Sequence, residues 1–563
     1  FKRFTMAKFV LNGKEIEFTQ GQTIIEAAKA AGTVIPHFCW HPSLSISGNC
    51  RVCLVEVEKM PKLAIACSTL AAEGMVVHSE SEKTLAARNA VMEFLLINHP
   101  LDCPICDEAG ECKLQDYAYA HSAGESRFVE EKNYKDKRVE LGTRVLFDGD
   151  RCISCSRCIR FCDEIAKEPE LTFVKRGDRV TIVTLPGKKM NNPYSMNTID
   201  ICPVGALTSK DFRFKARVWD MSANKTICNG CSRGCNIEMW VRNNEVMRLT
   251  PRQNDEVNQY WMCDHGRVNT FKFINDEERV DGPHIRREGK LAKAGWDEAF
   301  ASASSQLKHF DKDEVAFIGS AFATCEDNYV FQKFAHSVIG SKHLGFMKHV
   351  NPEFGDDILR KNDATPNTMG AELVGVAPKS GGMDIDGIIK GINSGKIKAL
   401  YLIEDDIVSA NPELENALAK LDLLIVHATN FNKTTTLAEI VFPAATYAEK
   451  NGTIVNFEGR VQRLKPSVAT VEMDRSLEGM EMSRLDKFGT QFDRWAKGNK
   501  RDARSTWKII SALSSTLGHK MKFNMAEEVF DDMSKNIEAF KGLDYDVIGE
   551  KGTKLNVGVA AKA

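Results

Sequence analysis

The stretch HPLDCPICDEAGEC, residues 99–112, decides how the first part of this chain is built. It places one histidine and three cysteines in the pattern His99-x3-Cys103-x2-Cys106-x5-Cys112. A lone histidine after a helix is usually a cap or a core residue, but here three thiols follow within thirteen positions. The stretch is therefore a candidate metal-binding set with mixed nitrogen and sulfur ligands.

The cysteines are unevenly distributed along the chain. Of the seventeen in 563 residues, sixteen lie between Cys39 and Cys263, and only Cys325 lies beyond them. They come largely in Cys-x2-Cys pairs, and no export signal is evident in the sequence. We therefore expect a reducing compartment and metal ligation in place of disulfides.

The first cysteine set follows a predicted β-hairpin. Asn12-Gly13 is a favoured tight-turn pair between the alternating runs of residues 8–18, and a short helix is expected from Gln22 to about Ala31. Gaps of ten, two and thirteen residues separate the thiols of Cys39, Cys50, Cys53 and Cys67. A zinc ribbon would need two close pairs. The spacing resembles the loop of 2Fe-2S ferredoxins, where four thiolates reach two irons.

The second set is the mixed stretch at residues 99–112. Ser81 is expected to cap a helix that runs to Asn98 and delivers His99. The stretch resembles the 4Fe-4S segment shared by respiratory complex I and iron-only hydrogenases. That resemblance implies the ligands His99, Cys103, Cys106 and Cys112.

The third set, Cys152-x2-Cys155-x2-Cys158, has the spacing that wraps three corners of a 4Fe-4S cubane. Two residues compete for the fourth corner. Cys162 has the bacterial ferredoxin spacing, but Cys202 is followed by Pro203, as closing ligands usually are. We favour Cys202 and interpret Cys162 as a buried free thiol.

The fourth set is Cys228-x2-Cys231-x3-Cys235-x27-Cys263. It resembles the 4Fe-4S signature at the front of molybdopterin oxidoreductases and of some bacterial complex I subunits. A zinc site with four thiolates is the alternative, but it would place a redox-inert metal beside three electron carriers. A 4Fe-4S cluster is favoured.

The second half has the periodicity of an α/β protein. A helix is expected from Trp296, and residues 315–319, 400–403 and 423–426 are expected to be buried strands of a parallel sheet. Residues 319–324, 438–445, 449–453 and 456–462 resemble motifs of the molybdopterin-oxidoreductase superfamily.

A molybdenum enzyme of the formate dehydrogenase kind would need residues that are missing here. Residues 340–347, where that family has a metal-binding thiol, contain none, and Cys325 lies too early. Asp264 stands where formate dehydrogenases tend to have lysine. Residues 281–563 also look short for a two-pterin scaffold. No molybdopterin is expected, and this region is predicted to be non-catalytic.

The order of the four sets resembles the large iron–sulfur subunit of bacterial NADH:quinone oxidoreductase, respiratory complex I. The resemblance implies one 2Fe-2S and three 4Fe-4S clusters that relay electrons from a flavin subunit toward quinone, coupled in the whole complex to ion translocation. By family analogy the relay uses the Cys39, Cys152 and His99 sets, with the Cys228 set off the main path. It further implies an NADH-oxidising flavin subunit with its small 2Fe-2S partner, downstream cluster and quinone-site subunits, and a peripheral place on the cytoplasmic face of the bacterial inner membrane.

The expected fold is α/β and multidomain. It comprises a β-grasp 2Fe-2S ferredoxin domain (6–82), a histidine-ligated 4Fe-4S segment (83–122), a ferredoxin-like 4Fe-4S domain (123–220), a 4Fe-4S domain of molybdopterin-oxidoreductase type (221–280) and a degenerate molybdopterin-oxidoreductase α/β domain (281–563).

Composition restricts the remaining functions. The net charge of -2 predicts no nucleic-acid partner, and no apolar run is long enough to span a membrane, so membrane contact is expected only through partner subunits. Neither a dinucleotide fingerprint nor a Walker loop occurs. The alternatives are a subunit of an NAD-linked formate dehydrogenase, a hydrogenase-associated diaphorase subunit, an iron-only hydrogenase and a zinc-binding scaffold.

Overall fold

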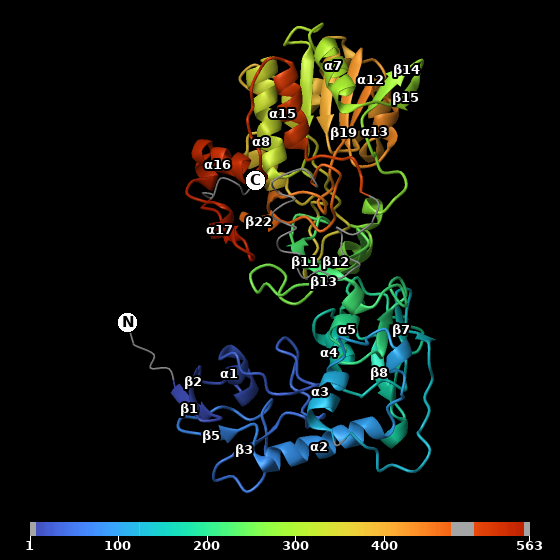
Figure 1. The fold of residues 1–563 in the computed structure, drawn as a ribbon, viewed down its shortest axis with the longest axis vertical. Helices are drawn as coiled ribbons and strands as arrows, with labels where there is room; N and C mark the ends of the chain where they lie inside the picture. The colour runs from blue at the N-terminus through green and yellow to red at the C-terminus, as the bar shows by residue number, and fades with distance from the viewer. Residues whose placement is uncertain (1–6, 123, 474–499, 557–563) are drawn as a thin grey trace. The chain divides into compact units, whose positions relative to one another are not determined.

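The computed structural model describes residues 7–122, 124–473 and 500–556. The chain divides into two compact units, Phe1–Trp219 and Asp220–Ala563, and each is described by itself. Figure 1 shows both units with their helices and strands labelled.

Unit 1 opens with a five-stranded mixed sheet. Its strands run in the order β2 (Lys14–Phe18), β1 (Ala7–Leu11), β5 (Val76–His78), β3 (Leu54–Val57) and β4 (Ala64–Ile65). Strands β1 and β5 are parallel, and the apolar face of helix α1 (Ile24–Ala30) packs with the strands in one core. This is the predicted β-grasp ferredoxin domain.

The local predictions for this domain are nearly all confirmed. Asn12 and Gly13 have φ of 49° and 79°, as a two-residue hairpin turn requires. The helix expected from Gln22 begins two residues later, because the Thr23 hydroxyl accepts from the Glu26 N–H and the Glu26 carboxylate accepts from the Thr23 N–H. That capping box fixes the helix start at Ile24.

The predicted helix before His99 is also confirmed. Helix α2 (Glu82–Ile97) starts after Ser81, whose hydroxyl accepts from the Thr84 N–H at 3.3 Å, and Asn98 is its C-cap. The short helices η1 (Cys103–Ile105) and α3 (Lys113–His121) follow it.

The rest of unit 1 carries the third cysteine set. A sheet of β10 (Leu207–Ser209), β7 (Val145–Phe147) and β6 (Val139–Glu140) lies in this region, with the hairpin β8 (Leu171–Val174) and β9 (Thr181–Thr184). Helices α4 (Arg157–Glu164) and α5 (Asn197–Asp200) complete it.

Unit 2 starts with a small antiparallel sheet of β11 (Ser222–Ile227), β12 (Asn236–Arg242) and β13 (Glu245–Pro251), followed by α6 (Asp264–Val268). A seven-stranded sheet then forms in the order β15, β14, β20, β19, β18, β16, β17. Their bounds are β14 (His284–Arg287), β15 (Lys290–Lys293), β16 (Val315–Gly319), β17 (Leu344–Phe346), β18 (Ala399–Ile403), β19 (Leu423–Ala428) and β20 (Ile440–Pro443).

The strands β17, β16, β18, β19 and β20 are parallel, as the sequence predicted for β16, β18 and β19. The antiparallel hairpin β14–β15 extends the sheet at the β20 edge, which the sequence reasoning did not foresee. Alternate strand residues enter two cores, because Phe317 faces one cluster and Ile318 the other. Because parallel strands are buried on both faces, their sequences are continuously apolar.

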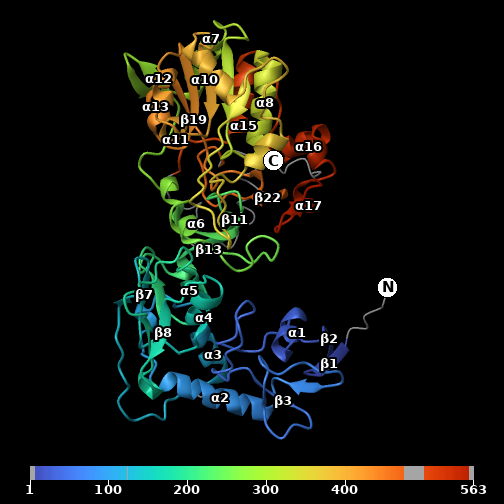
Figure 2. The same ribbon diagram turned by 180° about the vertical axis from the view of Figure 1, so that it is seen from behind.

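Helices cover both faces of this sheet, as the two opposite views show (Figures 1 and 2). One core includes α7 (Trp296–Leu307), α8 (Cys325–Lys333), α15 (Thr506–Thr516) and α16 (Ala526–Asn536). The other includes α10 (Ile385–Asn393), α11 (Ile407–Ala410) and α12 (Leu414–Leu418).

The remaining elements of unit 2 complete the fold. A third sheet joins β21 (Gly452–Val455), β22 (Arg460–Leu464) and β23 (Thr553–Lys554). The short helices are α9 (Thr368–Leu373), α13 (Lys433–Thr436) and α17 (Tyr545–Ile548). Across the described parts of both units, every helix is too short or too polar to cross a membrane.

Candidate metal centres

The first set brings its four thiols together beside the β-grasp sheet. Cys53 and Cys67 flank the paired strands β3 and β4, and the Cys39 N–H donates to the Cys50 sulfur at 3.4 Å. Thiol contacts join Cys39 to Cys50 and to Cys67, and Cys53 to Cys67. These contacts lower the pKa of Cys39 to about 2 and raise that of Cys67. The same contacts lower the pKa of Cys53.

The mixed set lines one small pocket. Its walls include all four predicted ligands, His99, Cys103, Cys106 and Cys112, together with Asp102, Arg151 and Gly205. Burial, and next the Arg151 charge, lower the pKa of His99 to about 4. The imidazole is therefore neutral near pH 7, which is the form that binds a metal.

Two of the thiols in this pocket are buried. Burial raises the pKa of Cys106, and it raises the pKa of Cys112 to about 12. Metal binding must displace their protons, which couples metal affinity to pH. Cys103 is exposed.

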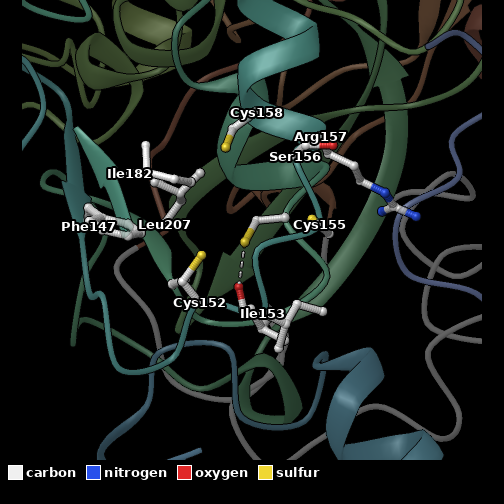
Figure 3. A pocket seen from close by; sticks show the side chains of 12 residues that line it. Phe147, Cys152, Ile153, Cys155, Ser156, Arg157, Cys158, Ile182 and Leu207 are labelled. Atoms are coloured by element: carbon white, nitrogen blue, oxygen red, sulfur yellow. Dashed lines mark hydrogen bonds between the residues drawn. The ribbon is translucent and has the colours of Figure 1, made fainter. Parts of the chain in front are cut away.

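The third set surrounds a small pocket, and Figure 3 shows Cys152, Cys155 and Cys158 around it with apolar side chains beside them. Cys202 lines the same pocket and donates its S–H to the Val204 carbonyl at 2.9 Å. Cys162 is fully buried on α4 but is not part of the pocket lining. The structure therefore brings together the four residues that we favoured.

The loop of this third set has an unusual backbone. Ser154 and Ser156, which stand between the ligands, have φ of 55° and 62°. Non-glycine residues rarely take this left-handed conformation, and such strain concentrates at functional sites. Arg51, between Cys50 and Cys53, has φ of 60° in the first set. In this conformation the backbone directs successive thiols of the third set toward the same pocket.

The fourth set lies in unit 2, between the small sheet and α6. The Cys228 N–H donates to the Cys235 carbonyl at 2.8 Å, and Cys263 caps α6 by accepting from the Gly266 N–H at 3.3 Å. A Cβ at Gly266 would lie 3.0 Å from the Cys228 sulfur and 3.4 Å from the Cys263 sulfur. Cys231 is buried beside them, and burial raises the pKa of Cys263 to about 12.

The donor sets fit iron–sulfur clusters in composition and shape. Two sets line pockets, and at Gly205 and Gly266 a side chain would collide with ligand sulfurs. Within residues 7–122, 124–473 and 500–556, no group of three or more His, Cys, Asp or Glu side chains is placed to hold a single metal ion. Cysteine thiolates, with one histidine, are the ligands that iron–sulfur clusters take.

A separate cavity of about 270 Å³ lies in unit 2, at the carboxyl ends of β18, β19 and β20. Its described lining is Asn229, Gly230, His265, Asn269, Thr270, Phe273, Phe322, Ala364, Glu404, Thr429, Thr446 and Tyr447. This described lining contains no cysteine, lysine or arginine, so it supplies no thiolate for molybdenum and no strong cation for a pterin phosphate. Cys325 lies in the core, where its S–H meets the Asn367 side-chain oxygen at 3.5 Å.

Family models match this chain in the order of its cysteine sets. They are a 2Fe-2S iron–sulfur cluster binding domain at residues 5–82, an NADH-ubiquinone oxidoreductase-G iron–sulfur binding region at 88–127, and the ferredoxin-like domain of NADH-quinone oxidoreductase subunit 3 at 142–208. A molybdopterin oxidoreductase Fe4S4 domain matches 221–275, and molybdopterin oxidoreductase matches 279–370 and 375–477. The mixed α/β fold class is confirmed.

Relatives named as the G-type subunit of NADH-quinone oxidoreductase share about two-fifths of their aligned residues with the chain. The Rickettsia bellii protein is 41% identical over 336 residues, which cover 59% of this chain and 48% of that protein. Over the aligned residues, the chain is similar to the G-type subunit of NADH-quinone oxidoreductase. The Streptomyces coelicolor G-type subunit is 38% identical over 357 residues, 63% of this chain and 42% of its own length. The chain thus aligns with about half the length of these G-type relatives.

Among solved structures, an NAD+-reducing [NiFe]-hydrogenase in the H2-reduced state shares 31% sequence identity with the chain. The match covers 38% of this chain and 91% of the hydrogenase chain, with a TM-score of 0.35.

Several charged residues near the sites were missed by the sequence reasoning. Arg151 and Arg157 line the second and third pockets, and both are buried. Arg151 follows Asp150 directly, and Arg157 stands between two ligands, but sequence gives no sign that either side chain is buried.

Proposed function

We propose that the chain is an electron-relay subunit of an NADH-quinone oxidoreductase, with one 2Fe-2S and three 4Fe-4S clusters. The chain makes and breaks no substrate bonds in this role. It holds the clusters near one another and sets their reduction potentials through ligand type, burial and hydrogen bonds to sulfur. Bound clusters supply the one-electron chemistry.

We assign sixteen side chains to the clusters. The 2Fe-2S ligands are Cys39, Cys50, Cys53 and Cys67, and the 4Fe-4S ligands form three sets: His99, Cys103, Cys106 and Cys112; Cys152, Cys155, Cys158 and Cys202; Cys228, Cys231, Cys235 and Cys263.

One observation carries the proposal: contacts join the first set of unit 1 to the third, and the third set to the second. The Arg160 guanidinium donates to the Cys39 carbonyl at 2.5 Å and to the Cys155 carbonyl at 3.3 Å, which joins the first set to the third. The Cys112 sulfur lies 3.9 Å from the carbonyl of Pro203, the neighbour of Cys202, which joins the third set to the second. This contact order supports a relay through the Cys39, Cys152 and His99 sets in turn.

The names of the relatives suggest the surroundings of this relay. We infer a flavin-containing NADH-oxidising subunit with a small 2Fe-2S partner as the electron source, and cluster-bearing subunits leading to a quinone site as the acceptor. The complex would lie at the cytoplasmic face of a bacterial inner membrane, with the chain attached through partner subunits. We infer no molybdopterin, because the described lining of the unit 2 cavity has neither thiol nor strong cation.

The test is a metal count and spectroscopy on the full chain purified without oxygen. We expect about fourteen iron atoms with matching acid-labile sulfide, the content of one 2Fe-2S and three 4Fe-4S clusters. After dithionite reduction, electron paramagnetic resonance should resolve one 2Fe-2S signal among 4Fe-4S signals. An iron content near zero with about four zinc ions would overturn the proposal.

A further inference from the structure

Two arginines on helix α4 lie between the first and third cysteine sets. Arg157 and Arg160 are three residues apart, so they project from neighbouring positions on the same side of the helix. The helix begins directly after Ser156 in the loop that carries Cys155.

Arg157 connects the backbone beside one ligand of each set. Its Nη1 donates to the Ile201 carbonyl at 2.9 Å, and its Nη2 donates to the Trp40 carbonyl at 2.5 Å. Ile201 precedes Cys202, and Trp40 follows Cys39. The side chain runs away from Cys152 and Cys158 (Figure 3), as a bridge to another site requires.

Arg160 also joins the two sets, and it contacts the ligand residues themselves. Its Nη2 donates to the carbonyls of Cys39 and Cys155, and its Nη1 donates to the Ser45 carbonyl. Its Nε donates to the Ser156 hydroxyl at 3.1 Å. A neighbouring contact also joins the loops of the two sets, since the Asn49 amide donates to the Ser154 carbonyl at 3.0 Å.

The positive charge of Arg157 is buried, and the carbonyls that it contacts carry no negative charge to balance it. The residue is 4% exposed, and among the described residues no carboxylate forms a salt bridge with it. Its Nε is buried and has no hydrogen-bond partner among the described residues. Buried charges are normally paired, because an unpaired one loses its hydration without compensation. The ionisable groups that act most strongly on Arg157 are ligand cysteines of both sets: Cys155, Cys202, Cys39 and Cys50.

We infer that Arg157 and Arg160 are positioning residues shared by two clusters, and that the clusters themselves are the counter-charge of Arg157. This inference rests on the proposed function. A cluster gains one negative charge on reduction, so a buried cation beside it favours the reduced state and raises the potential. Because one guanidinium lies beside both sites, the same residue raises both potentials.

The test uses redox titration of the full chain, with the 2Fe-2S signal and the Cys152-set 4Fe-4S signal followed by electron paramagnetic resonance. The variants are Arg157→Met, Arg157→Lys and Arg160→Met, with Arg179→Met at an exposed position of unit 1 as the matched control. We expect Arg157→Met to lower both potentials, Arg157→Lys to retain most of each because it keeps the charge, and Arg179→Met to move neither.

The outcomes separate the two claims. If the unaltered chain lacks clusters, the proposed function fails. If it has its clusters and Arg157→Met moves one potential or neither, this inference alone fails. Should Arg157→Met not assemble, Arg160→Met decides by the same two potentials, and unchanged values would overturn the inference. The inference would also be overturned if Arg157→Lys moved both potentials as far as Arg157→Met does, because the charge of residue 157 would then not be the cause.

Discussion

Gly205 lies directly against the sulfur of Cys106. A Cβ at position 205 would be 2.2 Å from that sulfur and 3.0 Å from the Glu108 Cβ. Gly205 stands three residues after Cys202, so the chain that closes the third set also forms a wall of the second pocket. No side chain larger than hydrogen fits there without displacing a ligand.

Gly205→Ala should therefore remove the histidine-ligated cluster. We expect the loss of about four iron atoms per chain and of one 4Fe-4S signal, with the 2Fe-2S signal retained. Gly295→Ala is the control, because a Cβ at Gly295 meets nothing within 4 Å. Full iron content in Gly205→Ala would contradict the placement of Cys106.

Serine variants separate the two candidates for the fourth ligand of the third set. Cys202→Ser should lose this cluster or leave it with three irons, because Cys202 lines the pocket with Cys152, Cys155 and Cys158. Cys162→Ser should keep the full iron content, because Cys162 is buried outside that lining. Iron and sulfide counts with resonance spectra check both. Iron loss in Cys162→Ser alone would reverse the assignment.

Arg151 should tune the histidine-ligated cluster alone. Its Nε and Nη2 donate to Asp102, while its Nη1 is buried without a hydrogen-bond partner among the described residues. Arg151→Met removes a cation from the pocket wall, so the potential of this cluster should fall by tens of millivolts. The 2Fe-2S potential serves as the internal reference. A fall of equal size in both would point to a general structural effect.

Unit 2 contains a buried charge network that should dominate its stability. The Lys450 Nζ lies 2.7 Å from carboxylate oxygens of both Asp327 and Glu404, and all three side chains are at most 5% exposed. Lys450→Met leaves two carboxylates buried, which should cost about 3–5 kcal/mol. Calorimetry should show a lower unfolding temperature. The exposed pair Lys293–Asp281 is the control, since Lys293→Met should change stability by about 1 kcal/mol or less.

Glu326 should make unit 2 less stable as the pH rises. Burial raises its pKa from 4.5 to about 7, although the Thr453 N–H and the Tyr545 hydroxyl donate to it. Between those values the folded chain keeps a proton that the unfolded chain has lost, so stability falls by about 3 kcal/mol in total.

Glu326→Gln, a neutral side chain of the same shape, should flatten this dependence. The measurement is the unfolding temperature of unit 2 from pH 4.5 to 7 in Glu326→Gln and in the exposed control Glu458→Gln. A slope unchanged in Glu326→Gln would show that another group titrates.

Local patterns predicted the elements that depend on neighbours in sequence. The turn at Asn12-Gly13, the helix after Ser81 and the strand at residues 315–319 all follow from spacing and capping. The contacts that define the surroundings of the sites could not be read in this way. Arg157 reaches Trp40 across 117 residues of sequence, and Gly205 is constrained by a sulfur 99 positions before it. Such pairs are set by tertiary packing, which a single sequence does not display.

The strained loop of the third set has a consequence for biogenesis. Ser154 and Ser156 hold left-handed backbone, and the thiols of Cys155 and Cys158 are less than one-tenth exposed. Iron and sulfide must reach thiols that the folded chain buries. Delivery therefore has to precede closure of residues 152–158, or the loop has to open locally. We expect cluster loading at this centre to be coupled to the folding of residues 152–158.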